Sequence, residues 1–217
     1  MMNSPEQRRG RVSASLLLIV LLTAPAATKA VGDAGNLLRK MAPKTPATHG
    51  FVEVRQSRLL RRPSISTGTL EYRGPGQLVK SVLKPVERRF EVDGTVARLS
   101  PGTGPVRNFD LGNVPELSAI FAGISGIMGG DEAAIRKVFN LSLEEHGSRW
   151  TLRMVPLDTK VLRRIRALEV RGNANGAQCI DVLEASGATS TMVLVDDHVA
   201  IPTTDPTAWL ESKCTSP

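Results

Sequence analysis

The chain has 217 residues and a formal net charge of +7, and 41% of its residues are hydrophobic but only 4% are aromatic. This length suits one domain with a sizeable hydrophobic core. The basic residues are scattered along expected strands, without the interleaved aromatic side chains of nucleic-acid platforms, so the composition argues against a nucleic-acid partner.

The first 30 residues have the three parts of a cleavable secretory signal peptide. A basic segment with three arginines spans 8–11, and an apolar run follows over 16–22. Small residues of the kind that a signal peptidase reads occur at 24–26 and again at 28–30. The sequence therefore predicts export, with 1–30 as the segment that is removed.

A membrane anchor is the alternative for this apolar segment. Its seven residues are too few to cross a bilayer, because a spanning helix needs about 20. No cysteine lies near the cleavage positions, so lipid attachment of the bacterial lipoprotein type is not expected. We therefore expect a single released domain over 31–217, whose 24 basic and 20 acidic residues give a net charge of +4.

After the signal peptide, we expect a short amphipathic helix followed by strands. Residues 31–42 place three apolar side chains at helical spacing, and prolines end this pattern. Alternation with a period of two then begins, and turn residues interrupt it, among them Asp93-Gly94, a strong hairpin signal. The strands predicted in this half are 49–60, 67–73, 77–83, 86–92, 95–99 and 105–111.

A helical insert interrupts the strands in the middle of the chain. Apolar residues at helical spacing form a stripe over 115–128, two glycines end it, and Asp131 is expected to cap a second helix over 132–138. A helical turn is expected at 158–164, and an irregular tail over 196–217. The later strands are predicted at 139–145, 149–155, 165–171, 177–185 and 189–195.

The order of these elements indicates a mainly β fold with an α lid. Tight turns join most strands, which favours a curved antiparallel sheet of about 11 strands over βαβ units. A sheet of that width must curl, and its concave apolar face must be covered. The central helix is the expected cover. Periodicity leaves open whether this helix completes a dry core or covers a ligand cavity.

Two cysteines, Cys179 and Cys214, are present. Their separation and the absence of a CxxC motif do not indicate a metal site. An oxidising compartment permits a disulfide between them, which would tie the C-terminal tail to a late strand. Geometry decides whether this disulfide forms.

The sequence contains no motif that indicates catalysis. It has neither a GxSxG elbow nor a phosphate-binding glycine loop. A hydrolase that uses Asp197 and His198 is one hypothesis, but a polar turn explains these two residues better. We therefore expect a binding protein rather than an enzyme, with no metal and no cofactor.

Several segments, taken in order, resemble the bacterial outer-membrane lipoprotein carrier (LolA-like) family over about 35–195. The F-x-E-x-R opening of the family's first long strand resembles 51–55, and its G-x-x-W-x-L-x-L-x-P stretch resembles 147–156. Three further resemblances are the G-x-L-x-[YW] stretch with its turn proline at 68–80, the hairpin at 92–94 and the Pro-Glu-Leu start of the helical insert at 115–117.

The resemblance implies an unclosed β-barrel with short helices as a lid, and a soluble, monomeric periplasmic carrier. Such a carrier shields acyl chains of lipoproteins or other lipids between an inner-membrane exporter and an outer-membrane acceptor, and it needs no cofactor. The implied hydrophobic face consists of Leu70, Tyr72, Val79, Phe90, Trp150, Leu152 and Met154. The implied lid residues are Leu117, Ile120, Phe121, Ile124 and Ile127.

The chain departs from the family where the lid is tied closed. The family has an arginine directly before the turn proline, whereas this chain has Gly74 there and Arg73 one residue earlier. Arg73 is therefore the latch candidate. Ser81 stands where the family has an aromatic residue of the next strand. These departures indicate a divergent relative, and the alternative function is an envelope interaction or sensor module on the same fold.

Overall fold

Eleven antiparallel strands form the body of the protein, which the computed structural model describes over residues 33–42, 46–195 and 205–215. The strands are β1 (Ala47–Gln56), β2 (Ser64–Gly74), β3 (Gln77–Lys84), β4 (Arg88–Asp93), β5 (Val96–Pro101), β6 (Arg107–Asp110), β7 (Phe139–His146), β8 (Arg149–Pro156), β9 (Ile165–Asn173), β10 (Gly176–Glu184) and β11 (Thr189–Val195).

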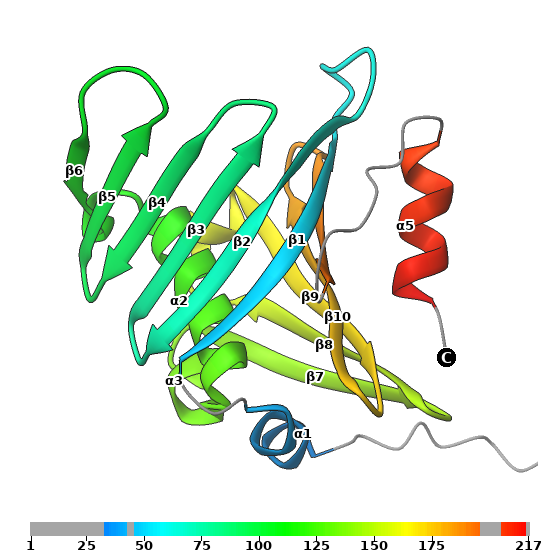
Figure 1. Ribbon diagram of the computed structural model, residues 1–217. Helices are drawn as coiled ribbons and strands as arrows, with labels where there is room; N and C mark the ends of the chain where they lie inside the picture. Colours follow the sequence, from blue (N-terminus) through cyan, green and yellow to red (C-terminus); the bar gives the residue numbers. More distant parts are fainter. Residues whose placement is uncertain (1–32, 43–45, 196–204, 216–217) are drawn as a thin grey trace, which may run out of the picture.

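The strand order places β1 and β11 side by side at the centre of one sheet. From this centre, β2 to β6 continue to one edge and β10 to β7 continue to the other, so β6 and β7 are the outer strands. The sheet curves without closing (Figure 1). The predicted fold, an unclosed antiparallel sheet of about 11 strands with short helices, is confirmed.

The longest helix of the described chain lies inside the curve of the sheet. Helix α2 (Pro115–Gly129) follows the outer strand β6 and precedes the opposite outer strand β7, so it crosses the concave face between the two halves (Figure 1). The remaining helical segments are η1 (Leu111–Asn113), α1 (Ala34–Met41), α3 (Glu132–Arg136), α4 (Thr159–Leu162) and α5 (Pro206–Cys214).

Local sequence sets both ends of α2. Pro115 lies in its first turn, where a backbone N–H has no hydrogen-bond partner within the helix, so proline loses no bond there. Gly130 ends the helix in the left-handed conformation, with φ of 65°, which glycine adopts at no steric cost. Asp131 then caps α3, as the sequence predicts, because its carboxylate accepts a hydrogen bond from the N–H of Ala134 at 2.9 Å.

The main core lies between α2 and the concave face. Large side chains from both halves of the sheet meet there, and Phe51, Leu70, Phe139 and Leu168 are each at most 1% exposed. Ile127 and Met128 from the C-terminal half of α2 are buried in the same cluster. The helix therefore holds the two halves of the open sheet at a fixed separation.

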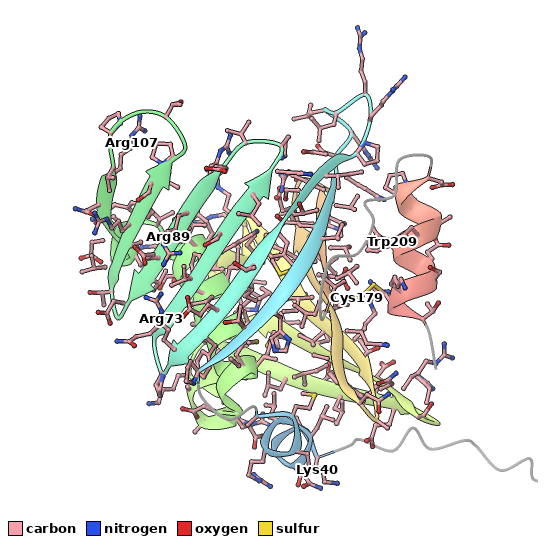
Figure 2. The ribbon with its side chains drawn as sticks, in the orientation of Figure 1. Lys40, Arg73, Arg89, Arg107, Cys179 and Trp209 are labelled. Atoms are coloured by element: carbon pink, nitrogen blue, oxygen red, sulfur yellow. A yellow bond between two sulfur atoms is a disulfide. The ribbon has the colours of Figure 1, made fainter. Side chains whose placement is uncertain are left out.

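The convex face carries a second, smaller core. Val52, Val54 and Val193 point to this side and pack against Leu210 of α5. Cys179 of β10 and Cys214 of α5 form a disulfide with their Cα atoms 5.7 Å apart. Both faces of the sheet centre are therefore covered, one by α2 and the other by α5 (Figure 2 labels Cys179 and Trp209 on this side).

Two of the differences from the predicted elements are large, and the other bounds differ by up to three residues. The expected irregular tail contains helix α5, which begins where the Asp205 carboxylate accepts hydrogen bonds from the N–H groups of Thr207 and Ala208. The strand expected over 49–60 ends at Gln56, because the chain turns and the N–H of Leu60 donates to the carbonyl of Ser57. The first difference is a helix that was not predicted, and the second is a strand that ends earlier than predicted.

The predicted signal peptide, 1–30, and the Asp197–His198 pair lie outside the described residues. In the part of the chain that is described, no helix has the length and apolar character needed to cross a bilayer. The division into a signal peptide and a single domain over 31–217 stays a prediction.

Removing the disulfide tests how α5 is held. We expect the Cys179→Ala/Cys214→Ala protein to lose about 2–4 kcal/mol of unfolding free energy, because a cross-link restricts the unfolded chain. Denaturant unfolding measures this loss, and limited proteolysis should cut the C-terminal tail first. Wild-type protein treated with a reductant is the matched control and should lose the same amount. Equal stability of oxidised and reduced protein would contradict the prediction.

Candidate functional site

A cavity of about 700 Å³ lies between the N-terminal half of α2 and the concave face of the sheet. This volume falls within the range of about 300–1,000 Å³ that is usual for small-molecule sites. Side chains of α2 form its roof, namely Leu117, Ile120, Phe121 and Ile124. Apolar side chains of four strands form much of its wall, namely Leu70, Leu78, Ile180, Val182 and Met192. We call this space the central cavity.

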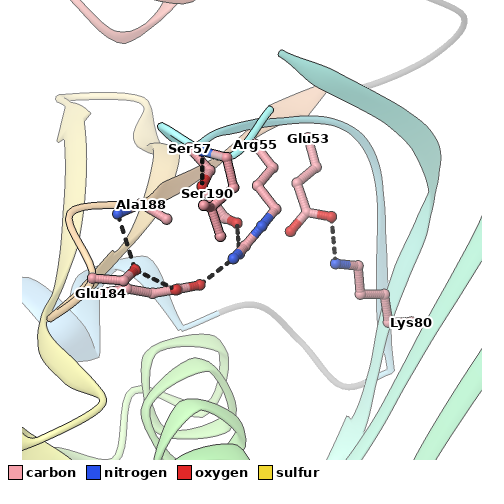
Figure 3. Close-up of polar contacts among 9 residues, drawn as sticks. Glu53, Arg55, Ser57, Lys80, Glu184, Ala188 and Ser190 are labelled. Carbon is pink, nitrogen blue, oxygen red and sulfur yellow. Dashed lines mark hydrogen bonds and ion pairs between the residues drawn. The ribbon is translucent and has the colours of Figure 1, made fainter. Parts of the chain in front are cut away.

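One part of the wall is ionic. The four side chains that we call the charged belt are Glu53, Arg55, Lys80 and Glu184, and all four line the central cavity. Figure 3 shows them joined in two pairs, and each pair reaches across one intervening strand of the sheet. Lys80 Nζ lies 2.7 Å from Glu53 Oε2, and Arg55 Nη1 lies 2.5 Å from Glu184 Oε1. The cavity wall therefore carries both charged and apolar side chains.

Neighbouring groups hold the belt in place. Arg55 also donates to the hydroxyl of Ser190 at 3.1 Å, and Lys80 Nζ lies 5.1 Å from the centre of the Phe51 ring. A cation over an aromatic face is attracted by the ring quadrupole. Glu53 accepts a second hydrogen bond, from Ser66. Each charge thus has more than one partner or support in the wall.

The Arg55 guanidinium lowers the pKa of Glu184 below its usual value of 4.5, since it donates a hydrogen bond to the carboxylate. Partial burial of Glu184 acts in the opposite direction, and a hydrogen bond from Ser186 adds to the lowering. Glu184 is therefore ionised at neutral pH, and Arg55 does not reach the cavity as a free cation.

Phe121 is the central residue of the lid. Its ring stacks on that of Phe90 in β4, with centroids 4.7 Å apart and planes 6° from parallel, and Phe90 in turn contacts Phe109 of β6. Phe121 also separates the central cavity from two neighbouring cavities of about 310 and 390 Å³, because it lines all three. Tyr72 lines the smaller neighbour and Phe90 the larger.

Three residues of the expected hydrophobic face lie in packed core instead. Trp150, Leu152 and Met154 are at most 5% exposed, and in the described chain they are not among the residues that line the central cavity. The indole N–H of Trp150 donates to the carbonyl of Asn173 at 2.9 Å. Ile127 of the expected lid packs into this same core. The C-terminal half of α2 thus lies mostly in packed core, although Ile127 and Met128 also line a cavity of about 340 Å³, and its N-terminal half covers the central cavity.

Val79 does not belong to the concave face. It lies directly opposite Glu71 on one side and Glu91 on the other, so its side chain points to the convex face. A bulge at Arg73 adds one residue to β2, and Tyr72 therefore pairs with Leu78 instead of Val79. Such a one-residue shift exchanges the two faces of the next strand. Leu78 lines the cavity in the place expected for Val79.

Arg73, the latch candidate, also lies on the convex face. Its guanidinium donates two hydrogen bonds of 2.9 Å to the carboxylate of Glu71 and lies 3.8 Å from that of Glu91. It therefore does not tie α2 to the sheet. A different contact joins the lid to this turn, where the N–H of Gly76 donates to the hydroxyl of Ser125 at 3.3 Å.

Sequence reasoning missed the charged belt and several apolar wall residues. The wall residues were Leu78, Ile180, Val182 and Met192. Alternation along β10 and β11 was the available signal, because Ile180 pairs with Met192 and both face α2. No comparable signal marked the belt, since charged residues in a strand normally indicate its solvent side.

The arrangement is suited to binding an amphiphile. Apolar side chains can take up an acyl chain, and the belt offers both signs of charge to a polar group. Within the described residues, no group of three or more His, Cys, Asp or Glu side chains is placed to hold a metal ion. No buried side-chain nitrogen or oxygen of those residues lacks a hydrogen-bond partner.

Comparison with known families and structures gives the following matches. Residues 25–215 match the sequence profile of the family described as outer membrane lipoprotein carrier protein, LolA-like. No curated protein matches the chain.

Solved structures that match the chain include a LolA superfamily protein from Nitrosomonas europaea. It is 11% identical, with a TM-score of 0.43, over 78% of this chain and 94% of that one. The MucA/MucB complex from Pseudomonas aeruginosa contains a chain that is 16% identical, with a TM-score of 0.38, over 82% of this chain and 60% of that one. A DUF1329 family protein from Desulfovibrio piger is 7% identical, with a TM-score of 0.41, over 81% and 95%.

The ion pair between Arg55 and Glu184 predicts a pH dependence of stability. Because the pKa of Glu184 is lowered in the folded protein, the pair stabilises the fold fully above pH 4.5 and is lost as the pH falls through the lowered pKa. Both side chains are partly exposed, so we expect a contribution of about 1 kcal/mol or less. Urea unfolding measured from pH 7 downward should fall less steeply for Glu184→Gln than for wild type. If the unfolding free energies of the two proteins fall equally as the pH decreases, the predicted contribution of this ion pair is wrong.

Proposed function

The chain belongs to the LolA-like family of outer membrane lipoprotein carrier proteins, and from this premise we propose that it is a soluble periplasmic carrier of acyl chains. In this proposal, acyl chains of lipoproteins or other lipids occupy the central cavity while they are ferried toward the outer membrane. An inner-membrane exporter would load the carrier, and an outer-membrane acceptor would unload it. The proposal assigns no catalytic residue and no cofactor.

The observation that carries the proposal is the apolar space beneath the N-terminal half of α2. Burial of an acyl chain is favourable by about 0.8 kcal/mol per methylene group. Binding must also order the chain, which offsets part of this gain. A chain of ordinary length still leaves useful affinity, because its many methylene groups contribute together.

The charged belt supports one orientation of the ligand. Arg55 lies next to the end of β1 at Gln56, and Glu184 is the last residue of β10, so this ion pair of the belt lies toward one end of the sheet. Leu70, which pairs with Lys80 of the belt, and Leu78 lie further along their strands and form part of the apolar wall. An amphiphile would therefore place its acyl chain against these leucines and its polar group beside Arg55 and Glu184.

The lid is attached more firmly at one end than at the other. Ile127 and Met128, at the C-terminal end of α2, are buried in the main core, whereas Leu117, Ile120 and Phe121 are only partly buried. We therefore expect loading to displace the N-terminal half of α2. The contact that must separate is the stack of Phe121 on Phe90.

The proposal is tested by analysing what the protein carries after purification from the periplasm. Native mass spectrometry and lipid extraction should find bound lipid, and lipid-free protein should take up a fluorescent fatty acid. Reproducible absence of both would overturn the carrier proposal and favour the envelope interaction module. The protein must retain its disulfide during this test.

Phe121→Asp should reduce fatty-acid uptake by at least tenfold. The substitution removes the stack on Phe90 and places a charge in the roof of the cavity, where an acyl chain has to be buried. Ala133→Asp, at an exposed position of α3, is the control and should leave uptake unchanged. Circular dichroism should show the same strand content in both. Normal uptake by folded Phe121→Asp protein would show that the lid is assigned wrongly.

Filling the cavity should compete with the ligand. Val182→Trp adds a large ring to the cavity wall, whereas Leu183→Trp adds the same ring on the opposite face of β10. We expect several-fold weaker binding of the fluorescent fatty acid by Val182→Trp and little change for Leu183→Trp. A titration followed by fluorescence measures both dissociation constants. Equal affinities of the two variants would place the ligand outside the central cavity.

A further inference from the structure

The connections at one end of the sheet carry most of the exposed large apolar side chains. Figure 1 shows the β1–β2, β3–β4 and β5–β6 connections at the same end. Of the seven large apolar residues that are exposed in the described chain, five lie in or beside these connections. They are Leu59 at 94% exposure, Leu60 at 42%, Leu83 at 55%, Val86 at 54% and Val106 at 46%. We call this end the loop rim.

The charge of the loop rim is almost entirely positive. Residues 57–63, 83–88 and 102–107 contain six basic side chains and a single acid, Glu87. All six basic side chains are exposed, and none of them takes part in an ion pair within the described part of the chain. They are Arg58, Arg61, Arg62, Lys84, Arg88 and Arg107. Basic charge of the described residues is therefore concentrated at this end.

The β1–β2 connection combines both features most closely. Leu59 and Leu60 form its tip, Arg58 precedes them, and Arg61 and Arg62 follow. Folding leaves these leucines in water, although each would gain from burial. Guanidinium groups beside them match the geometry of phosphate oxygens. An apolar tip between phosphate-binding groups fits the boundary between lipid headgroups and acyl chains.

The cavities open at the same end. The neighbouring cavity of about 390 Å³ is lined by Pro85, Val86 and Arg88, which are exposed residues of the loop rim. The central cavity is lined by Arg163 and Ser186, which are also exposed and lie beside the ends of β9 and β10 next to the rim. A flat partner on the loop rim would therefore face the cavity mouths.

We infer that the loop rim docks this protein on the surface of an anionic phospholipid bilayer, with Leu59 and Leu60 inserted and the six basic side chains on lipid phosphates. A membrane is favoured as the partner because the apolar and basic residues are spread over three separate connections at one end. This arrangement suits a flat, negatively charged surface. The inference goes beyond the proposed carrier function and does not depend on what the cavity holds.

Vesicle flotation tests the inference with the intact, disulfide-bonded protein. We expect binding to vesicles of phosphatidylglycerol and phosphatidylcholine, at least tenfold weaker binding to pure phosphatidylcholine, and a decrease with rising salt concentration. Equal binding to both kinds of vesicle, or binding to neither, would overturn the inference. The second outcome would favour a protein partner for the rim.

Two sets of variants distinguish vesicle binding by the loop rim from non-specific attraction to the protein's overall positive charge. Arg58→Glu/Arg61→Glu/Arg62→Glu should lose at least tenfold in affinity for the anionic vesicles. The matched control, Arg39→Glu/Lys40→Glu/Lys137→Glu, makes the same change in net charge on exposed positions at the other end of the molecule, where Figure 2 labels Lys40. Equal losses in both proteins would show non-specific attraction and overturn the inference.

Tryptophan fluorescence measures whether the tip of the β1–β2 connection inserts into the bilayer. A Leu59→Trp protein should show a blue shift of its fluorescence on anionic vesicles and quenching by lipids brominated in their acyl chains, relative to wild type. Leu59→Ser/Leu60→Ser should bind several-fold more weakly. Unchanged fluorescence and unchanged binding would overturn insertion. All rim variants should take up fluorescent fatty acid normally without vesicles, so failure of docking and failure of the carrier proposal are distinguishable.

Discussion

The pairing of β1 with β11 is the constraint on which the rest of the structure depends. It joins two antiparallel halves that are each continuous in sequence, and it leaves β6 and β7 as free outer strands. Because α2 connects these two outer strands, the chain itself carries the helix across the concave face. The central strands also become the most deeply covered, with Phe51 against the inner core and Val52 and Val54 against α5.

Coverage of both faces explains why charged residues line the cavity. In a sheet with one solvent face, Glu53 and Arg55 would point to water and the neighbouring Val52 and Val54 to the core. Here the valines face α5, so alternation turns Glu53 and Arg55 toward α2. Their charges are stabilised by Lys80 and Glu184, which strand pairing brings from distant parts of the chain. The belt is thus a consequence of topology, and no local pattern indicates it.

Much of the fold could be predicted because its signals are local. Hairpin glycines, the cap at Asp131 and the alternation within each strand fixed the order of the elements. Predictions failed where a single inserted residue sets the face of a strand, or where a contact with a distant part of the chain sets the position of a side chain. The bulge at Arg73 moved Val79 to the wrong face, and α5 was missed although Asp205 and Pro206 form a helix start. Periodicity also does not report the volume left between packed elements. It therefore did not distinguish the packed core around Trp150 from the cavity under Phe121.

The two ends of α2 differ in how they are held, and the two ends of the sheet differ in what they carry. The main core holds the C-terminal end of the helix, whereas the partly buried roof residues, the pair of Arg55 and Glu184, and the loop rim lie toward the other end. A movement that separates Phe121 from Phe90 would therefore widen the cavity on the side of Leu59 and Arg58, not on the side of α1. An amphiphile with its polar group at the belt would then leave with that group first, toward the phosphates of a bilayer. The arrangement that would keep an acyl chain from water would thus release it beside a bilayer, where lipid replaces the protein as the apolar environment.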